Sequence, residues 1–138
     1  MRLSRASVYA LQALARLAAR GAAAPVASHV LAEADGSPDR FLLKVLKPLV
    51  SAGVLRSVRG PGGGYRLARP ADTVTLLEVV EALEGPVRGA APPVGGPLDA
   101  RLQAVCDEAA GLTRQALAKV RVSELAAAGA KGRRQAGG

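Results

Sequence analysis

Basic side chains gather around a glycine-rich stretch in the middle of the chain. Residues 59–70 contain four glycines, with Arg59 before them, Tyr65 directly after them, and Arg66 and Arg69 beyond. Because glycine has no side chain, such a tip can lie close against a narrow, negatively charged groove. Guanidinium groups beside it can then reach phosphates or the floor of that groove. The stretch therefore predicts a basic hairpin tip that binds nucleic acid.

A second basic group has the spacing of one helix face. Arg40, Lys44 and Lys47 fall at positions i, i+4 and i+7 of a helix predicted over residues 37–52. Arg40 lies in the first turn of this helix, where a recognition helix usually meets base edges. The inward face of the same helix is predicted to consist of Leu42, Val45, Leu46 and Leu49.

Turn and capping residues indicate which elements position these basic groups. Ser37 is predicted to cap the third helix, with Asp39 near the positive end of its dipole. The predicted elements are helices over residues 4–20, 25–34, 37–52 and 73–84, and strands over residues 54–59 and 65–68. Two helices joined by a short turn form a helix-turn-helix, and the hairpin after it makes a winged helix. We therefore predict a mainly α fold with a small β-hairpin, in a domain of residues 1–84.

The remaining residues predict a linker and a long helix. Residues 85–97 are rich in Gly and Pro and cannot hold regular structure. Within residues 98–128, a narrow heptad seam predicts a dimerisation helix, followed by a short terminal helix; packing of the seam against its own winged helix is the alternative. Residues 129–138 are predicted to be a disordered basic tail. The seam consists of Leu98, Leu102, Val105, Ala109, Leu112 and Ala116.

The positive charge is concentrated in the first half of the chain. The 138 residues carry a formal net charge of +8, and residues 1–72, with eleven Lys/Arg and four Asp/Glu, account for +7 of it. This distribution is typical of a nucleic-acid-binding module, and a merely solubilising surface is the alternative. The only aromatic residues are Tyr9, Phe41 and Tyr65. Their scarcity argues against binding of RNA or single strands, whose bases stack on aromatic rings.

Several other classes of protein are disfavoured. The single cysteine, Cys106, excludes an internal disulfide and fits a reducing compartment. No apolar run approaches the ~20 residues that span a membrane, so we expect a soluble, cytoplasmic protein without membrane contacts. The glycine tip is not a P-loop, because Tyr65 and Arg66 stand where Lys and Ser/Thr are required. No Ser/His/Asp or Cys/His catalytic set is found, and we do not expect an enzyme.

The order of these elements, together with the wing, resembles the Rrf-two family of bacterial winged-helix transcription regulators. The resemblance covers residues 1–84 well and the long helix only by its pattern. It implies a homodimeric repressor that binds a partly palindromic operator in double-stranded DNA, with recognition helices in successive major grooves and wings in the minor groove. It is carried by Met1 to Ser4, Tyr9, Phe41, Leu42, Leu46, Leu49, Ala52, Gly53 and residues 59–67.

The resemblance also implies roles for individual residues. Tyr65 has an alternative role, in which its ring anchors the hairpin to the core. The residues implied to read bases are Ser37, Asp39, Arg40 and Lys44. The residues implied to contact phosphate or the minor groove are Arg2, Ser4, Arg5, Tyr9, Arg56, Arg59, Gly62, Gly63, Tyr65 and Arg66.

The chain departs from the family in its cysteines. The best-known members hold an iron–sulfur cluster with three cysteines in and around the linker, but residues 85–97 contain no Cys, His, Asp or Glu. We therefore expect no cofactor and no metal site, and the effector is unknown. Two alternatives stay open: a redox regulator acting through Cys106, and a winged-helix module that docks onto protein. One face of the fourth helix is expected to be a solvated acidic surface: Glu78, Glu81 and Glu84.

Overall fold

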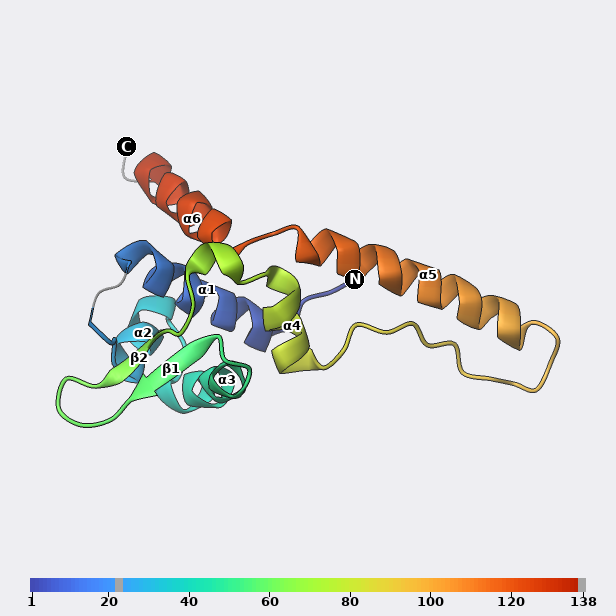
Figure 1. Ribbon diagram of the computed structural model, residues 1–138, viewed down its shortest axis with the longest axis horizontal. Coiled ribbons are helices and arrows are strands. Elements are labelled where there is room, and N and C mark those ends of the chain that lie inside the picture. The colour runs from blue at the N-terminus through green and yellow to red at the C-terminus, as the bar shows by residue number, and fades with distance from the viewer. Residues whose placement is uncertain (22–23, 137–138) are drawn as a thin grey trace.

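The computed structural model describes residues 1–21 and 24–136, with side chains up to residue 129. Its elements follow one another as a helical body, a two-stranded wing and a projecting arm (Figure 1). The helices are α1 (Arg5–Arg20), α2 (Ser28–Asp35), α3 (Asp39–Ser51), α4 (Leu76–Glu84), α5 (Asp99–Ala118) and α6 (Val122–Ala136). The strands are β1 (Leu55–Val58) and β2 (Gly64–Leu67), and a short 3₁₀ turn, η1 (Ala71–Thr73), precedes α4.

The core lies between α1, α2, α3, α4, the start of α6 and the base of the wing. All four residues predicted to form the inward face of α3 are buried, as are the small residues of α1 that pack against it, among them Ala10 and Ala13. Burial of apolar side chains from one stripe of each helix is what holds these helices together. The buried residues of α3 are Leu42, Val45, Leu46 and Leu49.

The turn between α2 and α3 differs from the prediction at Ser37. The helix begins at Asp39, Pro38 occupies the capping position, and no side chain caps it. Instead, Gly36 adopts a left-handed conformation and the Ser37 N–H donates to the Ala32 carbonyl at 3.0 Å. These backbone bonds close the end of α2 and hold Ser37 too early in the turn to cap α3. The prediction of Ser37 as the N-cap was therefore wrong.

The wing has a third strand-like edge that the sequence did not predict. The Val26 N–H donates to the Tyr65 carbonyl at 2.9 Å, and the Tyr65 N–H donates to the Val26 carbonyl at 2.8 Å. The residues before α2 are therefore extended, and α2 begins at Ser28 rather than at residue 25. Gly64 is required here, because a Cβ atom at this position would overlap the Val26 backbone.

The three glutamates of α4 form hydrogen bonds with residues of other segments. The prediction that they form a solvated acidic surface was therefore wrong. Glu78 accepts a hydrogen bond from Arg69 at 2.6 Å, and Glu81 accepts one from Arg114 of α5 at 2.6 Å. Glu84 accepts a hydrogen bond from the buried Ser7 hydroxyl of α1 at 2.5 Å. Helical spacing places these three carboxylates on one face, but only the fold brings a donor to each.

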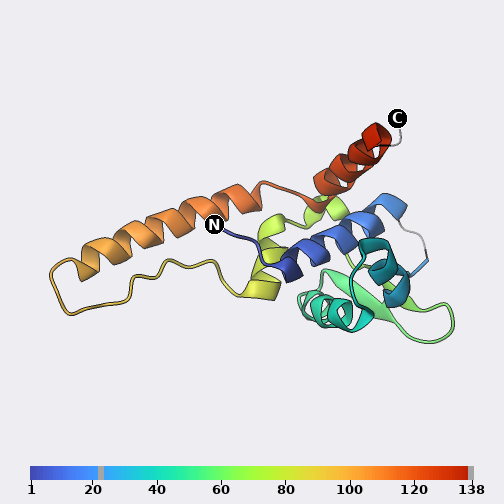
Figure 2. The same cartoon turned by 180° about the vertical axis from the view of Figure 1, so that it is seen from behind.

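The linker and α5 form an arm that leaves the body, and α6 returns to it (Figures 1 and 2). The linker is tied to α5 by Gln103, which donates to the Gly89 carbonyl at 3.0 Å and accepts from the Ala91 N–H at 3.1 Å. After α5, the Val122 N–H donates to the Val74 carbonyl at 2.9 Å, and α6 then packs along α1.

The end of the chain differs from the disordered tail expected from residue 129, because α6 continues as helix to Ala136. Alanine, arginine and glutamine are good helix formers, and basic residues near a helix C-terminus interact favourably with its dipole. None of the helices in the described part of the chain combines the length and apolarity that a membrane span needs.

Candidate nucleic-acid interface

The outward face of α3 is basic and its cations are unpaired. Asp39, Arg40, Lys44 and Lys47 are exposed, opposite the buried leucines and valine. None of the three cations forms an ion pair or side-chain hydrogen bond with a residue that the structure describes. Leu43 lies on the same outward side and is also exposed. The helix therefore offers charged donors around one apolar side chain, a set that can contact phosphates, base edges and methyl groups.

The start of α1 lies beside the start of α3. The rings of Tyr9 and Phe41 meet edge to face, with centroids 5.5 Å apart and an interplanar angle of 77°. Arg2 and Arg5 are exposed. Ser4 caps α1, since its hydroxyl accepts a hydrogen bond from the Ser7 N–H at 3.1 Å. Tyr9 and Ser4 thus have structural roles, and their contact with phosphate stays a prediction.

Two arginines face each other across the wing. The strand register pairs Arg56 directly with Arg66, and both side chains are exposed. Like charges in directly opposed positions destabilise a sheet, and neither arginine has an ion-pair partner among the residues described. An anion between or beside them would remove this repulsion. The pair is therefore suited to a phosphate.

Arg69 behaves differently from the other arginines of the wing. Its guanidinium donates to both Glu78 oxygens and to the Thr73 carbonyl. The hydrogen bond from Arg69, with its charge, lowers the pKa of Glu78 despite partial burial, and the same hydrogen bond raises the pKa of Arg69. Arg69 therefore fastens the end of the wing to α4 and is not among the free cations.

The tip of the wing is built for close approach. Arg59 and Gly62 are exposed, and a Cβ atom on Gly63 would overlap the Val58 carbonyl oxygen, so a larger residue there would push the tip open. Tyr65 packs against the core and is bonded through its backbone to Val26. Its position fits the anchoring role, while contact between Tyr65 and DNA stays a prediction.

Not every predicted site residue shares this surface. Ser37 is 9% exposed and its hydroxyl has no hydrogen-bond partner in the described structure, so it lies behind the face that carries Arg40 and Lys44. Lys47 and Leu43 are on that face but were not among the predicted contacts. The spacing of Lys47 at i+7 from Arg40 was a signal for the first. Leu43 lies at i+3 from Arg40 on the same predicted face, so helical spacing was a signal for it as well.

The predicted seam on α5 is uncovered. Its four large side chains are between 45% and 64% exposed, and Ala109 and Ala116 are exposed as well. Cys106, next to the seam, is partly buried, and the Gly89 backbone lies directly against its backbone. The exposed large side chains are Leu98, Leu102, Val105 and Leu112.

The residues do not fit an iron–sulfur cluster. A cluster needs several thiolates or substitutes that converge on one point. Across residues 1–21 and 24–136, no three His, Cys, Asp or Glu side chains lie where they could hold a metal ion together. The segment that packs against Cys106 supplies Gly89, with backbone atoms only.

Comparison with known proteins identifies relatives of this arrangement. Residues 3–128 match the model of the Rrf2 family, described as iron-dependent transcriptional regulators. IscR, an HTH-type transcriptional regulator of Cereibacter sphaeroides, is 41% identical over 88 residues, 61% of this chain and 56% of that protein. The chain spans about half the length of several curated relatives that it matches, 54% in each case.

Solved structures show the same fold. CymR of Bacillus subtilis, the global cysteine regulator of that bacterium, superimposes with a TM-score of 0.78 at 23% identity, over 92% of this chain and 97% of that chain. CymR of Staphylococcus aureus superimposes with a TM-score of 0.71 at 28% identity, over 89% of this chain and 96% of that chain. These matches confirm the winged-helix prediction and the family resemblance.

Proposed function

Because the chain belongs to the Rrf2 family of transcriptional regulators, we propose that it is a cytoplasmic homodimeric repressor that binds operator DNA without an iron–sulfur cluster. The observation that carries this proposal is the unpaired basic face of α3 together with the opposed arginines of the wing. In the described ion pairs, the carboxylates of Asp35, Glu78 and Glu81 are paired with Arg16, Arg69 and Arg114, and with none of these cations. Arg40, Lys44, Arg56 and Arg66 have no ion-pair partner in the described structure and are available to DNA.

We assign the two parts of this surface to two grooves. An α-helix fits the major groove, where the exposed Arg40 and Lys44 on the first half of α3 would read base edges. A wing tip made of four glycines and Pro61 fits the narrower minor groove, with Arg59 at its entrance. Arg56 and Arg66 would contact phosphate, which fixes the position of the protein without reading sequence.

The α5 seam supports a dimer. Four large apolar side chains along one narrow stripe are exposed in a single chain, and a second copy of the same helix would bury them by heptad packing. In such a dimer the two copies of α3 would occupy half-sites about one helical turn apart. Occupation of a promoter by such a dimer would block access to it, which is the simplest form of repression.

The absence of a cluster is proposed from the donor set. The linker has no ligand side chain, and Cys106 has no companion in the described structure that could complete a metal site. Cys106 is partly buried beneath the linker at Gly89, which favours a packing role over redox sensing. A visible absorption spectrum of anaerobically purified protein tests this proposal, because a cluster band would contradict it.

Selection of random DNA duplexes by the purified protein, followed by sequencing, tests the regulator itself. We expect a partly palindromic motif whose half-sites are centred about one helical turn apart. A protein-docking module would enrich no motif. Enrichment of a single half-site would contradict the dimer and leave the DNA-reading surface in place.

A further inference from the structure

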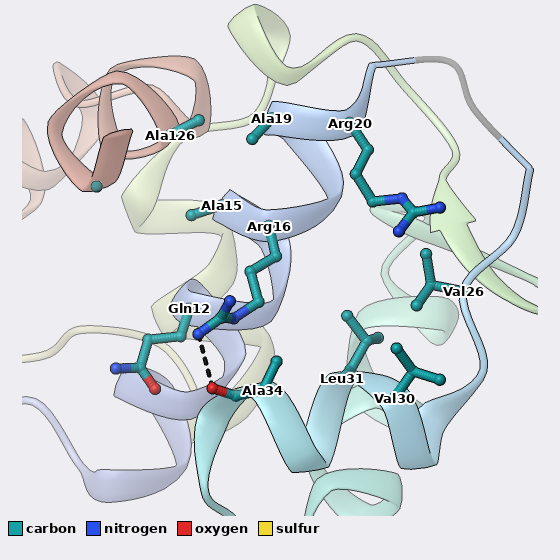
Figure 3. Close-up of a pocket in the computed structure, with 11 residues that line it drawn as sticks. Gln12, Ala15, Arg16, Ala19, Arg20, Val26, Val30, Leu31, Ala34 and Ala126 are labelled. Carbon is teal, nitrogen blue, oxygen red and sulfur yellow. Dashed lines mark hydrogen bonds between the residues drawn. The ribbon is translucent and has the colours of Figure 1, made fainter. Parts of the chain in front are cut away.

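A cavity outside the basic surface lies between α1, α2 and α6. It has a volume of about 460 Å³, within the range of small-molecule sites. Most of the described side chains that line it are apolar, none of them is a carboxylate, and the only cations among them are Arg16 and Arg20 (Figure 3). The apolar residues that line it are Ala15, Ala19, Val26, Val30, Leu31, Ala34 and Ala126.

The two arginines of the cavity are not equivalent. Arg16 already has partners: its Nε donates to Asp35 at 2.7 Å and its Nη2 donates to the Ala34 carbonyl at 2.7 Å. Arg20 is exposed and has no ion-pair or hydrogen-bond partner in the described part of the chain. The cavity therefore presents one uncompensated positive charge at its rim, beside Val26 (Figure 3).

The apolar wall of the cavity is partly exposed to solvent where α2 forms it. Val30 is 44% exposed although it borders the buried Leu31, and both side chains face the same cavity (Figure 3). A ligand with an apolar body would remove this surface from water. A single free guanidinium suits one carboxylate better than a dianionic phosphate, since the other guanidinium is already neutralised by Asp35.

We propose that this cavity binds a small amphiphilic monocarboxylate, with its carboxylate on Arg20 and its alkyl body between Val26, Val30 and Ala15. Hexanoate and octanoate, kept below their micelle-forming concentrations, are suitable probes. Hexanamide is the matched uncharged probe, because it has the same chain without the negative charge.

Titration calorimetry and saturation-transfer NMR on the full chain without DNA test the site. We expect saturable binding of octanoate, weaker binding of hexanoate and little binding of hexanamide. Arg20→Met should weaken octanoate binding about tenfold or more, since it removes a charge-assisted hydrogen bond. Arg88→Met, which removes an exposed arginine of the linker, is the matched control and should bind as the wild type does.

A second variant tests the apolar half of the cavity. Ala15→Leu should fill part of the cavity and weaken the binding of both hexanoate and octanoate. Thermal unfolding followed by circular dichroism verifies that this variant folds. Equal binding of hexanamide and hexanoate, unchanged binding by Arg20→Met, or no binding at millimolar concentration would each overturn the proposal.

The location of the cavity gives it a consequence for DNA binding, which rests on the proposed function. Arg16 holds the last residues of α2, directly before the turn into α3. The Asp35 side chain is 0% exposed, and its second oxygen has no partner in the described structure. A carboxylate held by Arg20, one helical turn along α1 from Arg16, would place a negative charge near this guanidinium, weaken its ion pair with Asp35 and loosen the turn that positions α3.

We therefore expect octanoate to weaken binding of the selected operator about fivefold or more, with an equal loss of octanoate affinity when DNA is bound. Fluorescence anisotropy with labelled operator measures the first factor and calorimetry of the DNA complex measures the second. Unchanged anisotropy at saturating octanoate would overturn this coupling. Failure to select any operator would refute the proposed function, while the DNA-free titrations would still decide the site.

Discussion

The arginines that face each other across the wing should oppose folding and favour DNA binding. Arg56 and Arg66 are directly paired in the strand register and exposed, without a described ion-pair partner. Opposed like charges on a sheet cost about 0.2–1 kcal/mol, and salt screening should keep an exposed pair near the lower end. Arg66→Gln, which keeps a long polar side chain, should therefore raise the free energy of unfolding by a few tenths of a kcal/mol, or about 1–2 °C in melting temperature.

The same substitution should weaken binding to DNA in a salt-dependent way. Each phosphate contact contributes about 0.9 to the slope of log affinity against log salt. Loss of the Arg66 contact should therefore flatten the slope by about 0.9, and loss of both arginines by about 1.8. Between 50 and 200 mM salt, one such contact corresponds to a change of about 3.5-fold in affinity.

Two measurements on each variant decide this prediction. Thermal unfolding without DNA gives the sign of the stability change, and anisotropy titrations over a salt series give the slope. Arg88→Gln in the linker is the control, and we expect it to change neither quantity. If Arg66→Gln lowered stability and left the salt slope unaltered, the pair would be a structural feature of the wing and not a phosphate site.

Three further predictions concern α3, α5 and α4. Arg40→Ala should cost about 1–3 kcal/mol of operator binding and relax preference at one base pair, so equal losses on operator and random duplex would contradict base reading. Leu102→Glu with Leu112→Glu should yield monomers in analytical ultracentrifugation; an intact dimer would exclude the seam as the interface. Glu78→Gln should cost less than about 1 kcal/mol near neutral pH. Arg69 lowers the pKa of Glu78 in the folded state, so this stabilisation exists above the unfolded-state pKa and is lost as pH falls through the folded-state pKa. The melting temperatures of the wild type and Glu78→Gln should converge in acid, and a difference between them that stays constant with pH would contradict this prediction.

The sequence was sufficient for elements that depend on local patterns. The inward face of α3 follows from apolar spacing, and Leu42 and Leu46 are buried as that spacing predicts. Ser37 was misassigned because the end of α2 and the start of α3 overlap at this residue. The left-handed Gly36 ends α2, and the Ser37 N–H donates to the Ala32 carbonyl as part of that helix end. The preference of serine for the N-cap position was therefore overridden by the backbone geometry of the preceding turn.

Contacts between distant segments could not be predicted. The bond between Val26 and Tyr65 joins residues 39 positions apart, and nothing in the composition of residues 24–27 signals a strand edge. The glutamates of α4 are a second case. Helical spacing put Glu81 and Glu84 on a common face, but their partners, Arg114 and Ser7, come from α5 and α1. Glutamates that the sequence places on one helix face therefore connect α4 to other elements of the fold.

The placement of these carboxylates leaves the exposed cations of α3 and the wing without ion-pair partners in the described structure. Asp35, Glu78 and Glu81 each take up an arginine that holds two elements together. Arg40, Lys44, Arg56 and Arg66 have no such partner in the described structure, so a polyanion need not break an existing ion pair to reach them. Pairing them internally would add little stability at an exposed surface, whereas leaving them free retains the full release of counterions when DNA binds. The same reasoning separates Arg20 from Arg16: the paired arginine positions α2, and the unpaired one is available to a ligand.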